Sequence, residues 1–218
     1  MFQDREEAGR ELAGRLAALA PERPVVLALP RGGVPVALPV ARALDAPLDL
    51  LLVRKIGMPG NPELAAGALV EGTPPEVVFN HCILRASGLG EADFAAAIEA
   101  ALKEIGRRRE RYLGGRPPLP VAGRSAIVVD DGIATGATVK AALGGLRARG
   151  PATIVLAIPV APRDVVPDLA PLVDELICLE TPDPFHAVGM HYRDFRQLSD
   201  PEVTAALQAA ERGREKGK

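Results

Sequence analysis

The sequence predicts an α/β fold in which helices flank a parallel β-sheet. Short runs that are apolar at every position alternate with longer segments whose apolar residues recur at helical spacing. Such continuous apolar runs are typical of strands buried on both faces, as in parallel sheets covered by helices. Apolar residues make up 48% of the 218 residues, so one domain with a packed core is expected over residues 1–218.

The chain is expected to begin with a helix at residues 4–20. Apolar side chains recur there at helical spacing from Ala8 to Leu19, and charged residues lie between them. Asp4 and Glu7 resemble a capping box, which marks the helix start.

A strand–helix–strand unit follows. The apolar run at 25–29 predicts a buried strand, and residues 34–44 predict a helix in which Pro39 suggests a kink or a later start. A second strand is predicted at 48–53. The glycines and prolines of residues 55–62 predict a loop after it.

The middle of the chain is expected to depart from this alternation. Residues 67–80 predict two short strands separated by residues 72–75, and residues 91–112 predict a long helix with one apolar face. The basic run at 107–111 is expected to be a solvated helix end. Prolines and glycines at 114–123 predict a linker.

The second half is expected to return to alternating strands and helices. Strands are predicted at 125–129, 153–158 and 175–179, and helices at 136–149, 165–172 and 201–212. Ligand sites in parallel sheets lie outside the carboxyl ends of the strands, so the loops that follow the strands are the candidate site segments.

Residues 126–138, AIVVDDGIATGAT, form the most informative run. An apolar strand there delivers two adjacent acids, Asp130 and Asp131, to a loop of small residues. Adjacent carboxylates repel each other and raise each other's pKa unless a cation or a hydrogen-bond donor compensates. The vicinal hydroxyls of a ribose are suitable donors, and a Mg²⁺ ion bound to the same sugar would neutralise the pair.

The loop after the acids predicts an anion site. Its small residues allow backbone N–H groups to turn inward, Thr135 and Thr138 add hydroxyl donors, and the following helix start contributes its positive end. The structural alternative is a plain strand–turn–helix connection in which Asp131 or Thr135 only caps the helix. The acidic pair at this spacing favours a site for a sugar phosphate.

Other phosphate-binding motifs fit less well. A Walker loop needs a lysine after its glycines, and residues 135–138 have none. A dinucleotide fingerprint needs Gly-x-Gly-x-x-Gly, which residues 132–136 do not supply. A receiver domain can carry an acidic pair, but its phosphorylation site does not need the phosphate loop.

Residues 127–138 resemble the 5-phosphoribosyl 1-diphosphate (PRPP) motif of the type I phosphoribosyltransferases. The resemblance implies the fold of that family, with a small hood at about 159–200 and the helix at 91–112 as an insertion. It also implies that Asp130 and Asp131 contact the ribose 2′ and 3′ hydroxyls and bind Mg²⁺ through PRPP and water. The 5′-phosphate would be held by the loop residues Ile133, Ala134, Thr135, Gly136, Ala137 and Thr138.

The family also has a short loop after its first sheet strand, which binds the diphosphate and often contains a non-proline cis peptide. The matching residues here are Pro30, Arg31, Gly32 and Gly33. The glycines would let the backbone approach phosphate, and Arg31 supplies a fixed positive charge. The structural alternative is a strand-end turn with a solvated arginine.

A flexible loop closes over the bound diphosphate in this family, and residues 54–63 hold the matching place. Lys55 or Arg54 could reach the leaving diphosphate, and the alternative is an ordinary exposed loop.

The hood that selects the acceptor is expected to be built from residues 159–163 and 181–196. Its aromatic and histidine side chains could stack on a base or hydrogen-bond it, and the candidates are Phe185, Tyr192, Phe195, His186 and His191. Packing within a small core is the alternative for each of the aromatic residues.

The resemblance implies a Mg²⁺-dependent enzyme in which diphosphate leaves the ribose anomeric carbon of PRPP and a small-molecule nitrogenous acceptor replaces it. Asp130 and Asp131 would position the ribose, while Arg31 and Lys55 would neutralise the leaving diphosphate. A non-catalytic regulator that binds PRPP or a nucleotide, and a hydrolase of phosphoribosyl bonds, are the alternative functions.

Bulk properties limit the expected partners. The formal net charge of −2 gives no reason to expect a nucleic-acid or membrane surface. The charged N-terminus has no apolar signal core, and Cys82 and Cys178 are too few for a disulfide framework, so a cytoplasmic protein is expected. The family resemblance implies a homodimer.

Overall fold

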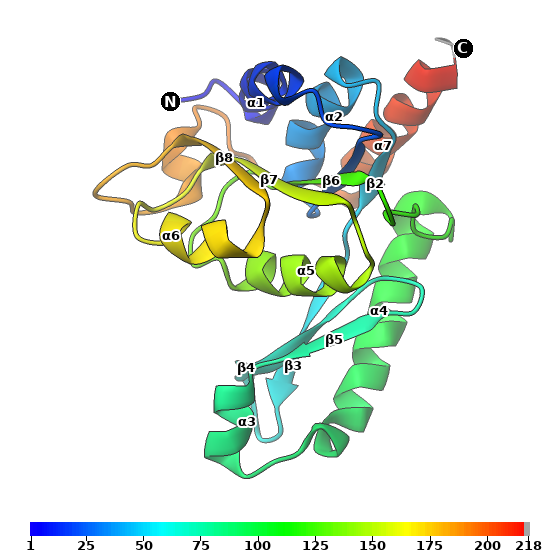
Figure 1. Ribbon diagram of the computed structural model, residues 1–218, viewed down its shortest axis with the longest axis vertical. Coiled ribbons are helices and arrows are strands. Elements are labelled where there is room, and N and C mark those ends of the chain that lie inside the picture. Colours follow the sequence, from blue (N-terminus) through cyan, green and yellow to red (C-terminus); the bar gives the residue numbers. More distant parts are fainter. Residues whose placement is uncertain (216–218) are drawn as a thin grey trace.

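The structure, a computed structural model, describes residues 1–215, apart from the side chains of residues 62, 63 and 213–215. Its main sheet has five parallel strands in the order β2-β1-β6-β7-β8 (Figure 1). In that order the strands are Leu48–Leu50, Val25–Ala28, Ser125–Val129, Thr153–Val160 and Glu175–Glu180. The predicted parallel α/β fold is confirmed.

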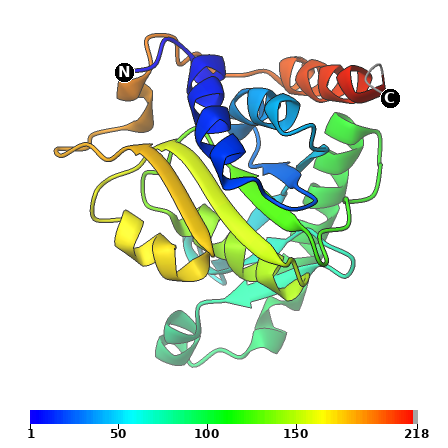
Figure 2. The same cartoon turned by 45° about the horizontal axis from the view of Figure 1, so that its top comes forward.

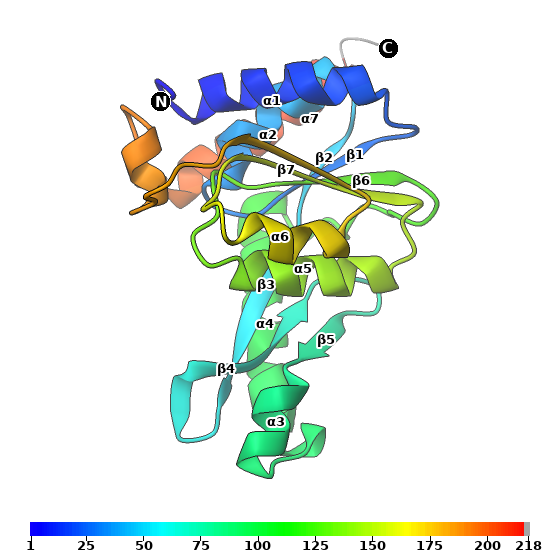
Figure 3. The same cartoon turned by 60° about the vertical axis from the view of Figure 1, so that its left-hand side comes forward.

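Helices cover both faces of the main sheet (Figures 1 and 3). One face carries α1 (Arg5–Leu19), α2 (Gly33–Ala43) and α7 (Asp200–Glu215), and the other carries α5 (Ala137–Ala148) and α6 (Val166–Leu169). Pro39 lies inside α2 and neither ends the helix nor delays its start.

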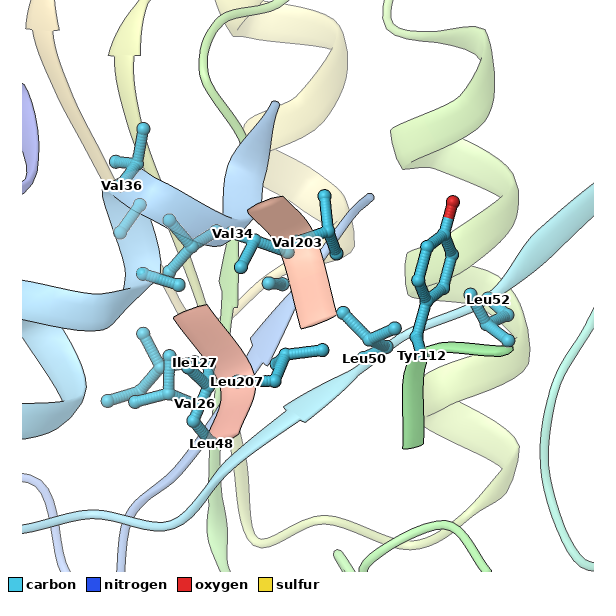
Figure 4. Packing of buried hydrophobic residues seen from close by; sticks show 14 of the residues in the cluster. Val26, Val34, Val36, Leu48, Leu50, Leu52, Tyr112, Ile127, Val203 and Leu207 are labelled. Carbon is cyan, nitrogen blue, oxygen red and sulfur yellow. The ribbon is translucent and has the colours of Figure 1, made fainter. Parts of the chain in front are cut away.

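The buried strand residues alternate between the two helical layers. Val26 and Ile127 belong to the same hydrophobic cluster as Leu207 of α7, as Figure 4 shows. Their neighbours Leu27 and Val128 belong to a second cluster, with α5 on the other face. Apolar burial on both faces explains why these strands are apolar at every position.

A second, antiparallel sheet consists of β3 (Val53–Met58), β4 (Asn61–Val70) and β5 (Glu76–Phe79). It packs between α5 and the long helix α4 (Ala95–Leu113), below the main sheet in Figure 1. The helix predicted at residues 91–112 is present, with a 3₁₀ turn over its first residues, Glu91–Phe94.

The loop predicted at residues 55–62 is mostly a β-hairpin. Met58 pairs with Asn61 across a two-residue turn in which Gly60 adopts a φ of 77°. Gly57 lies at a register shift between the two strands. The glycines and prolines therefore shape a hairpin and its turn, whereas the sequence pattern had predicted an unpaired loop.

Helix α3 (His81–Ser87) was not predicted from the sequence. The Asn80 side chain caps it by accepting hydrogen bonds from the backbone N–H groups of Cys82 and Ile83 at 3.1 and 3.3 Å. Only Leu84 of this helix is buried, so the helix carries no apolar stripe for a pattern to reveal. Two short 3₁₀ turns complete the structure, at Ala170–Leu172 and Val188–His191.

A buried cluster of charges joins the two sheets. Arg109 of α4 contacts Asp49 of β2 at 2.8 Å and Glu71, just after β4, at 2.9 Å. All three residues are buried. Arg109 thus departs from the solvated helix end that was expected for residues 107–111, because the partners of its guanidinium come from other elements.

Candidate active site

The two adjacent acids lie at the carboxyl edge of the main sheet. Asp130 and Asp131 directly follow β6, which is the central strand. The backbone N–H of Asp131 donates to the Asp130 carboxylate at 2.9 Å. Burial, together with the adjacent Asp131 charge, raises the pKa of Asp130 well above its ordinary range. Burial also raises the pKa of Asp131, although Arg5 opposes this shift.

Arg5 belongs to the candidate site and was not predicted from the sequence. Its Nε donates to Oδ2 of Asp131 at 2.8 Å, and its side chain is almost fully buried. The available signal was helical spacing, because Arg5 continues the buried stripe of α1 through Ala8 and Leu12 by one more turn. Leu19, in contrast, was assigned to that stripe and is 44% exposed.

The loop from residue 132 to 138 is fixed to the protein at Ile133, whereas its later residues leave their backbone N–H groups free in the described part of the chain. Ile133 is buried, and its N–H donates to the Val160 carbonyl at 2.9 Å. Gly136 precedes α5 with a left-handed φ of 74°, which favours glycine. Within residues 1–215, no protein acceptor is found for the backbone N–H groups of residues 134–138.

Most residues of this loop are exposed to solvent. Ala134, Thr135, Ala137 and Thr138 are exposed, whereas Gly136 is buried. Open N–H groups at the start of a twelve-residue helix, with two hydroxyls beside them, form a site that an anion can bind.

The two candidate motifs contact each other. Gly32 packs so closely on Asp131 that a Cβ atom at residue 32 would lie 2.0 Å from Oδ2 of that carboxylate. A Cβ atom at Gly33 would lie 2.5 Å from the Val129 carbonyl oxygen. The peptide bond between Pro30 and Arg31 is cis, as in the family loop that this segment resembles.

Arg31 extends from this loop toward the start of α7. One of its guanidinium nitrogens lies 3.9 Å from Oδ1 of Asp200, and the side chain is 39% exposed. Asp200 also accepts a hydrogen bond from the Tyr112 hydroxyl at 2.6 Å and pairs with Arg111. The Arg31 cation is therefore loosely paired and remains accessible to an anion.

Lys55 is not brought to the carboxyl edge of the main sheet. It lies on β3, opposite Ala68 of β4, and belongs to the second sheet. The β3–β4 hairpin nevertheless projects on the same side of the molecule as the hood, the left-hand side of Figure 3.

A pocket of about 620 Å³ lies between the loop and the hood. Its walls include Ala134 on one side, Arg163 and Asp164 after β7, and Asp183 and Phe185 in the hood. It therefore adjoins the anion loop.

The aromatic candidates of the hood separate into two groups. Phe185 lines the pocket and stacks on His191, with ring centroids 5.6 Å apart. Tyr192 and Phe195 instead stack on each other at 5.1 Å inside the hood, and neither lines that pocket. His186 is exposed on the hood and is likewise absent from the pocket walls.

Comparison with known proteins places this arrangement in a family. A family model described as the phosphoribosyl transferase domain matches residues 3–193. The chain belongs to the phosphoribosyl transferase family. The five-stranded parallel sheet and the sequence motif both agree with the type I phosphoribosyltransferase fold.

Two relatives illustrate the similarity. The chain is 43% identical to TT1426 from Thermus thermophilus, whose crystal structure gives a TM-score of 0.84, with 96% of this chain and 98% of that chain covered. It is 51% identical over 212 residues to a Mycobacterium tuberculosis protein named "Putative phosphoribosyl transferase Rv0571c". That alignment covers 97% of this chain but 47% of the relative, so the chain spans about half of that protein's length.

The described residues include neither a preformed cluster of metal ligands nor a membrane-spanning helix. Among the side chains that the structure describes, no group of three or more His, Cys, Asp or Glu residues is placed to hold a metal ion. No helix in the described part of the chain is long and apolar enough to cross a bilayer.

Proposed function

We propose that this chain transfers the 5-phosphoribosyl group of PRPP to a nitrogenous acceptor and releases diphosphate. The observation that carries the proposal is the contact between Gly32 and Asp131. It joins a candidate diphosphate loop to a candidate ribose site. PRPP carries both groups on one sugar, so it needs two such sites side by side.

Each part of PRPP has matching groups in this arrangement. The ribose hydroxyls would donate to Asp130 and Asp131, which lie at the end of the central strand. The 5′-phosphate would accept from the open N–H groups of residues 134–138 and from the hydroxyls of Thr135 and Thr138. The diphosphate would meet the backbone of residues 30–33 and the Arg31 guanidinium.

The residues present are suited to Mg²⁺ held together with PRPP. Mg²⁺ prefers oxygen ligands, uses one or two carboxylates, and retains water and substrate phosphates as its other ligands. Asp130 and Asp131 supply two adjacent carboxylates, and among the described residues Arg5 is the cation that pairs with them. Burial and the adjacent Asp131 charge disfavour the charged form of Asp130, and a bound metal ion would offset both effects. When bound, the ion would neutralise charge on the leaving diphosphate.

The chain's own contribution to the reaction is positioning and charge neutralisation. As the bond from C1 to diphosphate lengthens, positive charge develops on the ribose ring and negative charge on the leaving group. Arg31 stabilises the latter, and the fixed acids hold the sugar in line with the acceptor. Closure of the β3–β4 hairpin would add Lys55 to the leaving-group side and exclude water.

The acceptor would enter the pocket next to Ala134. Phe185 offers an aromatic wall, and Arg163 and Asp183 offer polar contacts of opposite charge. A planar nitrogen heterocycle could stack its face on Phe185 and form hydrogen bonds at its edges with Arg163 and Asp183.

The proposal is tested by product formation from PRPP and Mg²⁺ with a panel of purine, pyrimidine and other nitrogen acceptors. Diphosphate release that requires one acceptor supports the transferase. Release that ignores every acceptor would indicate hydrolysis, and PRPP binding without turnover would indicate a regulatory relative. The variant Asp130→Asn/Asp131→Asn is the matched control, because it keeps the size of both side chains while removing both charges.

A further inference from the structure

Asp131 is held at its side chain and at its backbone carbonyl by residues outside its own loop. Arg5 donates to its carboxylate at 2.8 Å, and the Tyr192 hydroxyl donates to its backbone carbonyl at 2.6 Å. The two partners come from opposite ends of the chain, one on the first turn of α1 and the other in the hood.

The Arg5 guanidinium is itself fixed by the hood. Its central carbon lies 3.9 Å from the ring centroid of Phe195, and its NH1 donates to the Arg196 carbonyl at 3.1 Å. A planar guanidinium can stack on an aromatic face and donate at its edge at the same time, which a lysine ammonium cannot do. Arg5 is only 9% exposed, so these contacts occur away from bulk water.

The N-terminal segment is bonded to the hood by its backbone as well. Phe2 N–H donates to the His191 carbonyl at 2.8 Å, and Arg193 N–H donates to the Phe2 carbonyl at 2.9 Å. Asp194 N–H donates to the Gln3 carbonyl at 2.9 Å. Figure 2 shows the N-terminus beside the hood, with α1 continuing over the sheet.

We infer that Arg5 is a positioning residue of the ribose site, which holds the Asp131 carboxylate correctly oriented and couples it to the hood. The inference rests on the proposed function, since it assigns Asp131 to the sugar hydroxyls. Arg5 does not contact substrate itself. It acts through Oδ2 of Asp131 and leaves Oδ1 available to accept from a hydroxyl.

Three fixed contacts identify Arg5 as a permanent support of the site. The alternative is that Arg5 blocks Asp131 in the free protein and moves away when the sugar binds. Leaving would break the bond to Asp131, the bond to the Arg196 carbonyl and the stack on Phe195. It would also leave two adjacent, partly buried carboxylates without their cation.

The test measures ligand affinities of Arg5→Gln and Arg5→Lys by calorimetry, with Mg²⁺ present. The probes are PRPP, ribose 5-phosphate and inorganic diphosphate. Arg5→Gln should weaken PRPP and ribose 5-phosphate by about tenfold or more, the order expected for a lost hydrogen bond to a charged group, and leave diphosphate unchanged. Arg5→Lys keeps the charge and should restore part of the affinity.

The control is Arg10→Gln on the same helix. Arg10 pairs with Glu6 in solvent, with both side chains more than half exposed, so its loss should leave all three affinities unchanged. Thermal melts of each variant separate folding from binding, and Arg5→Lys retains a charged partner for Asp131 if Arg5→Gln folds poorly.

Three results would overturn the inference. Equal weakening of the sugar ligands and diphosphate by Arg5→Gln would show a general structural role. Tighter binding of ribose 5-phosphate would show that Arg5 competes with the sugar. Unchanged affinity for all probes would show that Asp131 needs no support. Failure of the unsubstituted protein to bind PRPP or ribose 5-phosphate is a different result, which removes the proposed function and this inference with it.

Discussion

The Gly32 backbone lies directly against the Asp131 carboxylate, close enough that a methyl group at residue 32 would sit 2.0 Å from Oδ2. Residue 32 has an ordinary helical conformation, with φ −60° and ψ −36°, so its need for glycine is steric. The missing side chain is what allows the loop after β1 to touch the acids after β6.

Gly32→Ala is therefore expected to displace the Asp131 carboxylate and weaken PRPP binding. Overpacking of this kind costs about 1–3 kcal/mol, and a loss of that size in binding corresponds to roughly fivefold to 150-fold in the dissociation constant. The control is Gly106→Ala on α4, where a Cβ atom meets nothing within 4 Å. That variant should bind PRPP normally and gain up to about 1 kcal/mol of helix stability. Normal PRPP affinity in Gly32→Ala would contradict the contact.

Thr138→Val tests the anion loop. The substitution keeps the shape of the exposed side chain on the first turn of α5 and removes its hydroxyl donor. Ribose 5-phosphate and PRPP should bind about tenfold more weakly, because a hydrogen bond to a charged group is lost, and free diphosphate should bind as before. Thr153→Val, at the opposite end of the sheet, is the control. Equal weakening of all three ligands would refute the assignment of this loop to the 5′-phosphate.

Phe185→Ala tests the acceptor pocket. Loss of an aromatic wall should raise the KM for the acceptor by about tenfold, whereas the affinity for PRPP should stay the same. Met190→Ala removes another hood side chain, which is 59% exposed, and should change neither quantity. A weakened PRPP affinity with an unchanged acceptor KM would contradict the assignment of Phe185 to the acceptor pocket and would indicate a contact with PRPP instead.

Glu71 is expected to make stability depend on pH. Burial raises the pKa of Glu71 from 4.5 to about 7, against the opposing effect of Arg109. Because the folded pKa lies above the unfolded one, the free energy of unfolding falls as the pH rises between these values. At about 1.4 kcal/mol for each pH unit, the shift corresponds to roughly 3 kcal/mol.

Thermal melts between about pH 5 and pH 8 check this expectation. The melting temperature of Glu71→Gln should fall less with rising pH than that of the unsubstituted protein. The control is Glu99→Gln, an exposed α4 carboxylate paired with Lys103, which should retain the full slope. Identical slopes for the protein and Glu71→Gln would mean that Glu71 does not titrate in this window.

Much of the main sheet could be predicted from the sequence, for a clear physical reason. Strands buried on both faces must be apolar at every position, so β6 was predicted with its observed bounds, and the acids that follow it were placed at the sheet edge. The family motif then predicted the class of ligand.

Long-range charge pairs could not be predicted in the same way. Arg5 and Asp131 are 126 residues apart, and Arg109 and Asp49 are 60 residues apart. Helical periodicity tells which face a residue occupies but not which residue it will meet there. Arg109 was therefore predicted to lie in a solvated helix end, and no prediction was made for Arg5.

The β3–β4 hairpin shows a second limit. Gly57 and Gly60 favour a loop by local preference, yet pairing with β4 converts the segment into a strand and a tight turn. Tertiary context outweighed propensity there, and the position of Lys55 followed from it.

The most direct test of the central assignment is calorimetric titration of PRPP into the protein, with and without Mg²⁺, alongside Asp130→Asn/Asp131→Asn. Mg²⁺-dependent binding by the protein and its loss in the variant, with a nearly unchanged melting temperature, is the expected result. Undiminished binding by the variant, or no binding of millimolar PRPP by the protein, would contradict the assignment of Asp130 and Asp131 to the ribose of PRPP.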